Sequence, residues 1–242
     1  MNLCIDIGNS RIKAGFFEET KLIDSVYSDE HLNHELVSEW ASKYNIKQII
    51  ISSVRNLNQM EIDKISSDHD VSVADRFMPT PFKISYSTPD TLGIDRILGA
   101  AGAQSLFPDS NTLTIDAGTC ITYDIVYNGA FVGGAISPGL QMRLNAMHQL
   151  TNKLPLLQLS QPPVTFGSST ASSMQMGAER GAIHEFNGFI SQFLAEFPKL
   201  KVILTGGDST FFERHAENAT FTAPNLVLHG LNWTLLEMKR KK

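Results

Sequence analysis

The sequence is poor in cysteine and has no excess of basic charge. Its two cysteines, Cys4 and Cys120, both lie inside apolar runs, which is typical of reduced, buried thiols and not of a disulfide framework. Lys and Arg number 20 against 25 Asp and Glu, for a formal net charge of −5. Such a chain lacks the overall basic footprint of a nucleic-acid-binding protein. The basic run at 239–242 is typical of a solvated tail.

Long hydrophobic runs and a leader segment are also missing. No apolar run approaches the roughly 18 residues that a membrane-spanning helix needs. The first residues, Met1 to Asp6, lack the basic flank and apolar stretch of a secretory signal peptide. Hydrophobic residues make up 42% of the chain and charged residues 19%, as in ordinary globular proteins. We therefore expect a soluble cytoplasmic protein that binds neither membranes nor nucleic acid.

Several common catalytic motifs do not occur in the sequence. There is no Gly-x-x-x-x-Gly-Lys-Ser/Thr loop, and no Gly-x-Gly-x-x-Gly follows the first predicted strand, which excludes an ordinary P-loop protein and a dinucleotide-binding enzyme. Gly-x-Ser-x-Gly is missing as well, and no Ser/His/Asp arrangement is evident. His31, His34 and Glu35 could share a helix face, but no second cluster supplies the further ligands that zinc needs.

An internal repeat indicates how the chain is organised. The run Leu3–Asn9 aligns with Leu113–Thr119 at an offset of 110 residues (116 − 6). In each copy a buried strand ends in an Asp-x-Gly turn, and alternating apolar residues then predict a second strand. Helices are predicted at about 93–106, 172–197 and 225–239. Alternating strands and helices predict an α/β fold with two similar halves. We place the domains at 1–109 and 110–242.

The repeated turn has a chemical interpretation. Each copy places a carboxylate, Asp6 or Asp116, at the end of a buried strand, with a glycine two residues later that lets the backbone approach a ligand. Turn amides can form an anion nest, but a carboxylate repels phosphate unless a cation lies between them. Both aspartates are therefore predicted on the metal side of a nucleotide phosphate, where Lys13 could reach a transferring phosphoryl group. A plain hairpin turn explains one copy equally well, and the recurrence favours a site.

Two other turns are candidate site segments. Gly93–Arg96 opens a predicted helix, where Asp95 could accept a hydroxyl proton and Arg96 could hold a carboxylate or phosphate. A helix cap with a surface ion pair would explain the same residues. Gly206-Gly207, between a predicted strand and helix, could hold phosphate or the sugar and base of a nucleotide. Such glycine pairs are also common in ordinary turns.

Taken in order, the motifs resemble those of the type III pantothenate kinases, members of the acetate and sugar kinase/Hsp70/actin superfamily. The motifs are Asp6–Lys13, Gly93–Arg96, Asp116–Thr119 and Gly133–Leu140. The resemblance runs over nearly the whole chain and implies two ribonuclease H-like domains of the actin-like ATPase fold around a nucleotide cleft. It also implies the ATP-dependent phosphorylation of pantothenate to 4′-phosphopantothenate, the first step of coenzyme A biosynthesis.

The resemblance further implies roles for particular residues. Asp6 would hold Mg²⁺ through the ATP phosphates, Asp95 would accept the proton of the pantothenate hydroxyl, and Asp116 would ligate a monovalent cation, K⁺ or NH₄⁺. The implied ATP-binding residues are Asp6, Ile7, Gly8, Asn9, Ser10, Arg11, Ile12, Lys13 and Thr119. The implied substrate-binding residues are Tyr86, Gly93, Ile94, Asp95, Arg96 and Thr170. The family is dimeric, so a homodimer with the pantothenate site at the subunit interface is expected.

Two departures and two alternative functions accompany the resemblance. Ser10 stands where the family often has threonine, which keeps the hydroxyl, and the stretch from Gly139 to Thr170 is somewhat short. A non-catalytic transcription accessory factor on the same fold is one alternative; the intact site aspartates and the lack of a basic face argue against it. A kinase of another small hydroxylated substrate, such as a sugar, is the other, because the fold alone does not fix the substrate.

Overall fold

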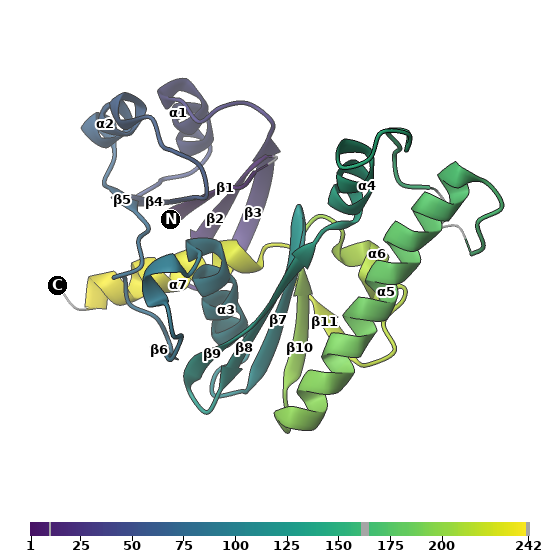
Figure 1. Cartoon of the computed structure of the whole chain (residues 1–242). Coiled ribbons are helices and arrows are strands. Elements are labelled where there is room, and N and C mark those ends of the chain that lie inside the picture. The colour runs from purple at the N-terminus through teal and green to yellow at the C-terminus, as the bar shows by residue number, and fades with distance from the viewer. Residues whose placement is uncertain (10, 161–164, 241–242) are drawn as a thin grey trace. The chain divides into compact units, whose positions relative to one another are not determined.

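The computed structural model describes residues 1–9, 11–160 and 165–240 of the chain (Figure 1). The chain divides into two compact units. Unit 1 comprises Met1–Ser110, Asn128–Gly133 and Asn225–Lys242, and unit 2 comprises Asn111–Tyr127 and Gly134–Pro224. The first segment of unit 1 therefore ends one residue after the predicted domain boundary at 109. Two later segments of the chain also belong to unit 1.

Unit 1 is built on a sheet with the strand order β3-β2-β1-β4-β5. Its strands are β1 (Asn2–Ile7), β2 (Ile12–Glu18), β3 (Lys21–Ser28), β4 (Gln48–Ser53) and β5 (Val71–Val73). β1 pairs antiparallel with β2 and parallel with β4. β1 and β4 contain apolar runs and lie inside the sheet, where helices cover both faces. A strand in that position is buried on both of its faces, so apolar residues suit every position along it.

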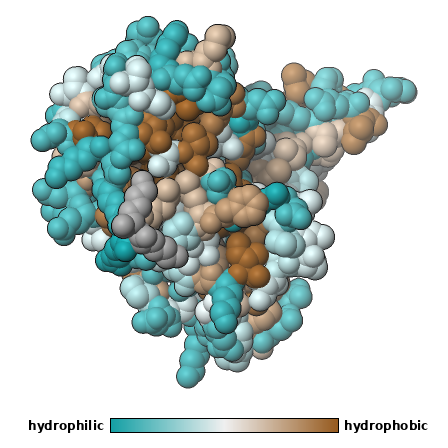
Figure 2. All heavy atoms as spheres, turned by 90° about the vertical axis from the view of Figure 1, so that its left-hand side faces the viewer, coloured by the Kyte–Doolittle hydropathy of each residue, from teal (hydrophilic) through white to brown (hydrophobic). Residues whose placement is uncertain are grey.

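Helices cover both faces of this sheet. They are α1 (His34–Ser42), α2 (Gln59–Asp68), α3 (Ile94–Leu106) and α7 (Leu226–Arg240). Leu3 and Ile5 of β1 pack with α1 and α2, whereas Cys4 packs with α3 and α7. Because side chains alternate along a strand, Asp6 lies on the same face as Cys4, toward α3 and α7. Figure 2 looks from the side that carries α2, β5 and the end of α7, where hydrophilic residues surround a region of hydrophobic ones.

Unit 2 repeats this pattern, which confirms the α/β class. Strand order in the second sheet is β11-β10-β7-β8-β9-β6, so that β7 pairs antiparallel with β8 and parallel with β10, as β1 does with β2 and β4. The strands are β6 (Lys83–Ile84), β7 (Thr112–Ala117), β8 (Cys120–Tyr127), β9 (Ala130–Pro138), β10 (Lys201–Thr205) and β11 (Thr220–Thr222). β6 and the first residues of β9 belong to unit 1.

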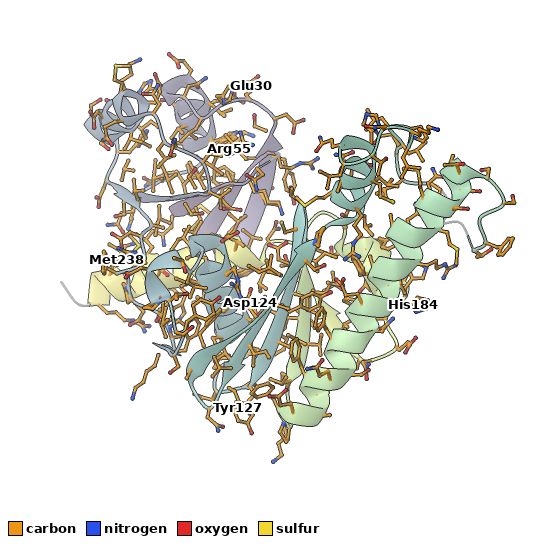
Figure 3. The ribbon with its side chains drawn as sticks, in the orientation of Figure 1. Glu30, Arg55, Asp124, Tyr127, His184 and Met238 are labelled. Carbon is orange, nitrogen blue, oxygen red and sulfur yellow. The ribbon has the colours of Figure 1, made fainter. Side chains whose placement is uncertain are left out.

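The helices of unit 2 pack on one face of its strands. They are α4 (Leu140–Gln149), α5 (Thr170–Glu196) and α6 (Ser209–Glu213). Ala182 and Phe186 of α5 pack against Leu113 and Ile115 of β7. Figure 3 labels Asp124 on β8 and His184 on α5. Throughout the described part of the chain, no helix is long and apolar enough to cross a membrane.

Within unit 1, α3 and α7 approach each other so closely that their backbones touch. A Cβ atom added at Gly102 of α3 would lie 2.0 Å from the backbone oxygen of Leu226. A Cβ atom at Gly230 of α7 would lie 1.9 Å from the backbone oxygen of Leu98. Neither distance is sterically possible, so this helix crossing requires glycine on both sides.

We expect Gly230→Ala to lower the free energy of unfolding by at least about 1–3 kcal/mol, since overpacking forces the two helices apart. Urea denaturation followed by circular dichroism measures the effect. Gly188→Ala is the matched control, because a Cβ atom at this position of α5 meets nothing within 4 Å. The control should be neutral or stabilising by about 0.5–1 kcal/mol, since alanine is the better helix former. Equal midpoints for Gly230→Ala and the wild type would contradict the close crossing.

Candidate functional site

Asp6 lies between two polar side chains on neighbouring strands of unit 1. In the strand register it stands opposite Lys13 on β2 and beside Ser52 on β4. Residues paired in this way project from the same face of a sheet, here the face toward α3 and α7. The Ser52 hydroxyl donates to Asp6 Oδ1 over 2.8 Å. A carboxylate and a hydroxyl are therefore in contact near the ends of β1 and β4, and Lys13 projects from the same face.

The surroundings of Asp6 alter its acidity. Burial raises the pKa of the Asp6 carboxyl, because desolvation penalises the charged form. The Ser52 hydrogen bond and the charge of Lys13 act in the opposite direction, and the charge of Asp95 raises the pKa again. The two carboxylates of unit 1 predicted to be functional are thus close enough to repel each other. A cation bound between them would relieve both the burial and the repulsion.

Asp95 lies in the first turn of α3, where an anion is favoured by the helix dipole. Its Oδ1 accepts a hydrogen bond from the backbone N–H of Arg96 over 2.9 Å. A Cβ atom at Gly93 would lie 2.4 Å from this same oxygen. Glycine at this helix start therefore leaves room for the carboxylate, which gives a physical reason for the Gly-x-Asp-Arg motif.

Arg96 and Tyr86 lie together in unit 1. The Arg96 side chain is buried, with 7% of the residue exposed, and its Cζ atom lies 5.7 Å from the centre of the Tyr86 ring. Tyr86 follows β6 in sequence, and the proximity of the two residues was predicted only through the family resemblance. The structure thus brings together, in unit 1, two pairs of predicted site residues: Asp6 with Asp95, and Tyr86 with Arg96.

The remaining residues of the first hairpin are arranged differently. Gly8 N–H donates to the Arg11 carbonyl over 3.1 Å and closes the turn, and Arg11 itself is exposed, 3.9 Å from Asp29. Ile7 and Ile12 are buried in the core beneath α1 and α2, so their side chains point away from Asp6. Within a phosphate loop, these two residues could contribute backbone groups alone.

Asn9 and Ser10 are the two predicted ATP-binding residues between Gly8 and Arg11 in the sequence. The Arg55 guanidinium donates to the backbone oxygen of Asn9 and so links the β4–α2 loop to the turn. Ser10 lies outside the described residues. Neither Ser52 nor Arg55 was identified from the sequence. Ser52 could have been found by noting that it ends the buried strand at 48–53, which pairs in parallel with the strand that carries Asp6.

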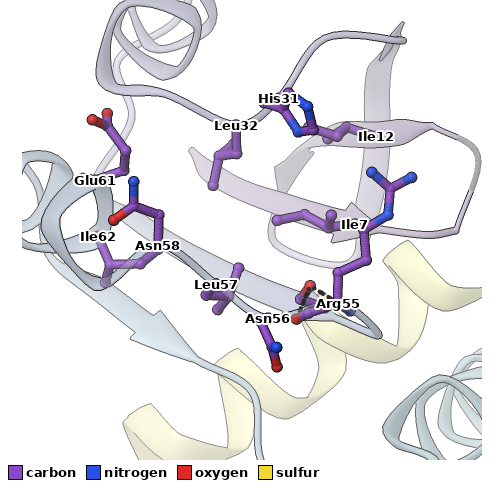
Figure 4. Close-up of a pocket in the computed structure, with 11 residues that line it drawn as sticks. Ile7, Ile12, His31, Leu32, Arg55, Asn56, Leu57, Asn58, Glu61 and Ile62 are labelled. Carbon is purple, nitrogen blue, oxygen red and sulfur yellow. Dashed lines mark hydrogen bonds between the residues drawn. The ribbon is translucent and has the colours of Figure 1, made fainter.

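A cavity of about 240 Å³ opens on the opposite face of the same hairpin (Figure 4). Ile7, Ile12 and Leu57 form part of its apolar lining, and His31 and Glu61 are among its polar residues. Asp6, Lys13 and Asp95 do not line it. Its position on the α1 and α2 side of the sheet separates it from the candidate site.

In unit 2, Asp116 lies at the end of β7 beside the Gly206-Gly207 turn. β10 runs parallel to β7 and pairs Thr205 with Asp116. Gly206 and Gly207, which follow Thr205, therefore lie against the Asp-x-Gly turn that begins at Asp116. A Cβ atom at Gly206 would lie 2.5 Å from Asp116 Oδ1, and this glycine has a φ of +96°. Asp208 N–H donates to the Ala117 carbonyl over 2.9 Å. The two glycine turns predicted as separate candidates are therefore neighbours.

Thr119 and Thr170 also belong to unit 2. The Thr119 carbonyl accepts a hydrogen bond from Gly139 N–H over 3.0 Å, which ties the Gly133–Leu140 motif to the second Asp-x-Gly hairpin. Thr170 is the exposed first residue of α5. The helix begins there because Ser169 and Ser172 form a reciprocal capping box.

Metal ligands were sought among all described side chains. In the described residues, no group of three or more His, Cys, Asp or Glu side chains could hold a metal ion. Asp6 and Asp116 could each contribute one carboxylate, and other ligands would have to come from backbone oxygens, water or a bound phosphate. Oxygen donors of this kind suit hard cations such as Mg²⁺ and not soft metals.

Sequence comparisons place these motifs among known enzymes. Residues 2–192 match the family model described as type III pantothenate kinase. The type III pantothenate kinase of Flavobacterium johnsoniae is 38% identical over 239 residues, covering 97% of each chain. That of Bacteroides fragilis strain ATCC 25285 is 37% identical over 234 residues, covering 96% of each chain.

Solved structures show the same fold at lower identity. A Campylobacter jejuni protein named for the Baf family of transcriptional activators matches with a TM-score of 0.60 and 20% identity, covering 98% of this chain and 99% of that one. The Acidaminococcus fermentans (R)-2-hydroxyglutaryl-CoA dehydratase component A matches with a TM-score of 0.59 and 14% identity, covering 100% of this chain and 99% of that one. The ROK hexokinase of Thermus thermophilus matches with a TM-score of 0.51 and 13% identity, covering 98% of this chain and 99% of that one. The predicted actin-like ATPase fold is thereby confirmed.

We expect Ser52→Ala to raise the pKa of Asp6 further, because the hydrogen bond that favours the charged carboxylate is lost while burial remains. Titration of ¹³C-labelled aspartate carboxyl resonances by NMR measures the shift. Ser42→Ala is the control, since the Ser42 hydroxyl bonds the Glu39 carbonyl at the surface of α1. An Asp6 pKa that is unchanged or lowered in Ser52→Ala would contradict this arrangement.

Proposed function

Because this chain belongs to the type III pantothenate kinase family, we propose that it transfers the γ-phosphoryl group of ATP to the hydroxyl of pantothenate. The product, 4′-phosphopantothenate, is that of the first step of coenzyme A biosynthesis. The observation that carries the proposal is the gathering of Asp6, Lys13 and Asp95 on one face of the unit 1 sheet. The relatives at 37–38% identity match over nearly their whole length.

The first hairpin, Asp6 to Lys13, is assigned to the ATP phosphates. Backbone amides of the turn would face phosphate oxygens, and Lys13 would place its ammonium near the transferring group as a point charge. Lys13 also lies 6.0 Å from the ring centre of Tyr27 on β3, a position that limits the directions its side chain can take. Thr119, on the second hairpin, is assigned to ATP as well.

Asp95 is assigned as the acceptor of the pantothenate hydroxyl proton. Its carboxylate is fixed at the start of α3 by the Arg96 N–H, which leaves the other carboxyl oxygen to face the substrate. Phosphoryl transfer has a loose transition state in most analyses, so proton removal is required late and the acceptor carboxylate need do little before then. Positioning and charge neutralisation supply the larger part of the rate.

Arg96 and Tyr86 are assigned to pantothenate binding, together with Gly93, Ile94 and Thr170. Arg96 can offer a planar pair of donors to the pantothenate carboxylate, which is the geometry that guanidinium and carboxylate share. Thr170 stands at the start of α5, where its hydroxyl and the helix N-terminus can both donate hydrogen bonds.

Two cations accompany this assignment. Asp6 would hold Mg²⁺ that arrives with ATP, since a half-buried carboxylate with a raised pKa is stabilised by a nearby positive charge. Asp116 would ligate a monovalent cation, K⁺ or NH₄⁺, with backbone oxygens of the adjoining turns. Both ions would neutralise phosphate charge during transfer.

The assembly and location follow from the family resemblance. We assign the chain as a cytoplasmic homodimer, with the pantothenate site completed at the subunit interface. A role as a transcription accessory factor is not favoured, because the curated relatives are named as kinases and the likeness to the Campylobacter jejuni protein shows the fold alone. A panel of small hydroxylated substrates in a coupled ADP assay separates pantothenate from sugars.

Asp95→Asn is expected to lower kcat by about 10²–10⁴, the usual contribution of a general base, while ATP binding stays largely intact. A coupled ADP assay with Mg²⁺ and K⁺ measures turnover, and calorimetry with a non-hydrolysable ATP analogue measures binding. Asp90→Asn is the control, as Asp90 is an exposed partner of Arg76 in the preceding turn. Turnover equal to wild type would remove Asp95 from its role. Wild-type protein that forms no ADP beyond the pantothenate-free blank would refute the kinase assignment.

A further inference from the structure

Three aromatic side chains of unit 1, Phe82, Tyr86 and Phe131, form what we term the aromatic wall. Phe131, near the start of β9, is completely buried, with an exposed fraction of 0%. Its ring centre lies 6.0 Å from that of Tyr86, with the planes at 76°, and 6.1 Å from that of Phe82. An edge-to-face arrangement of this kind is favourable for aromatic pairs. None of the roles assigned above involves Phe82 or Phe131.

The backbone fixes the wall in place. Ile84 of β6 pairs with Phe131 of β9, and Ser85 N–H donates to the Phe131 carbonyl over 2.9 Å. Tyr86 therefore follows directly from a strand hydrogen-bonded to Phe131, as the adjacency of β6 and β9 in Figure 1 shows. Gly133 lies two residues beyond Phe131, and a Cβ atom there would lie 3.5 Å from the Tyr86 ring. The Tyr86 ring thus packs over Gly133, a position of β9 that carries no side chain.

Arg96 of α3 packs against this wall. Its Cζ atom lies 5.7 Å from the ring centre of Tyr86 and 5.8 Å from that of Phe131. A guanidinium group at this distance from an aromatic ring is attracted by the ring quadrupole, and the attraction is stronger where water is excluded. Arg96 is itself buried, so its guanidinium has lost much of its hydration and gains from both rings.

From this geometry we propose that Phe131 is a positioning residue for the acidic substrate, holding the Arg96 guanidinium in the orientation that receives a carboxylate. The proposal rests on the kinase function proposed above. Because Phe131 is fully buried, it acts on the substrate through Arg96 and Tyr86 and not by contact. A side chain that is already ordered loses less conformational freedom on binding, so the ring raises affinity for the carboxylate substrate. The nucleotide, assigned to Asp6–Lys13, should be indifferent to it.

Phe131→Leu tests the proposal, as it keeps an apolar side chain and removes the ring. We expect the KM for pantothenate to rise about tenfold, in line with the loss of one buried cation–π contact. The KM for ATP should change less than about twofold. Phe82→Leu is the matched control, because it makes the same change in the same wall at a ring that packs on Phe131, while Phe131 itself lies against the Arg96 guanidinium. This control should leave both KM values near those of the wild type.

Two further measurements separate positioning from a general loss of structure. With a pantothenate analogue that carries an alcohol in place of the carboxylate, Phe131→Leu and the wild type should have the same KM. In an Arg96→Met background, Phe131→Leu should add no further loss. If Phe131→Leu fails to fold, Phe131→Met, which fills similar space without a ring, takes its place in the same comparisons.

The outcomes are distinguishable. Equal effects of Phe131→Leu and Phe82→Leu, or equal rises in KM for pantothenate and ATP, would overturn the positioning role while leaving the kinase assignment intact. An equal effect on the alcohol analogue would overturn it in the same way. Wild-type protein that neither binds nor phosphorylates pantothenate would refute the kinase assignment, and the positioning role with it.

Discussion

The organisation of unit 1 depends on a half-buried carboxylate near the end of its central strand. Asp6 is the penultimate residue of β1, and the apolar side chains of this strand pack in cores on both faces of the sheet. A charge in such a place is costly unless partners compensate it. Ser52 and Lys13 do so from the flanking strands, and the α3 helix start brings Asp95 to the same face. The strand order that places β2 and β4 beside β1 is therefore also the order that assembles the charged cluster.

Much of this architecture could be predicted from the sequence, because short stretches of residues determine it. The repeated run of a buried strand followed by Asp-x-Gly gave two sheets with matching strand order, and the helix expected at about 93–106 is observed as Ile94–Leu106. Contacts through space were not accessible in this way. Ser52 becomes a partner of Asp6 only once β4 is known to lie beside β1. The two-residue strand β6 is too short to leave a periodic signal, so the position of Tyr86 against Phe131 could not be foreseen.

The substrate is a different kind of question from the fold. A hexokinase, a dehydratase component and this chain share one architecture at 13–14% identity, so the fold is compatible with several activities. What distinguishes this chain is the ordered set of motifs that it shares with its 37–38% identical relatives. Their physical basis differs from motif to motif: Gly93 clears space for a carboxylate, whereas Gly206 adopts a backbone angle that other residues rarely take.

The glycine crossing of α3 and α7 has a consequence for biosynthesis. Cys4, Phe17 and Ile50 of the amino-terminal sheet are covered on one side by Leu228, Leu231 and Leu235, residues translated more than 170 positions later (228 − 50 = 178). On the ribosome, this apolar surface must stay uncovered until nearly all of the polypeptide has emerged. Nascent chains with exposed apolar surface are prone to aggregate and are typical clients of chaperones. Synthesis of unit 1 thus begins before that of unit 2, but its core can be completed only after unit 2 has been made.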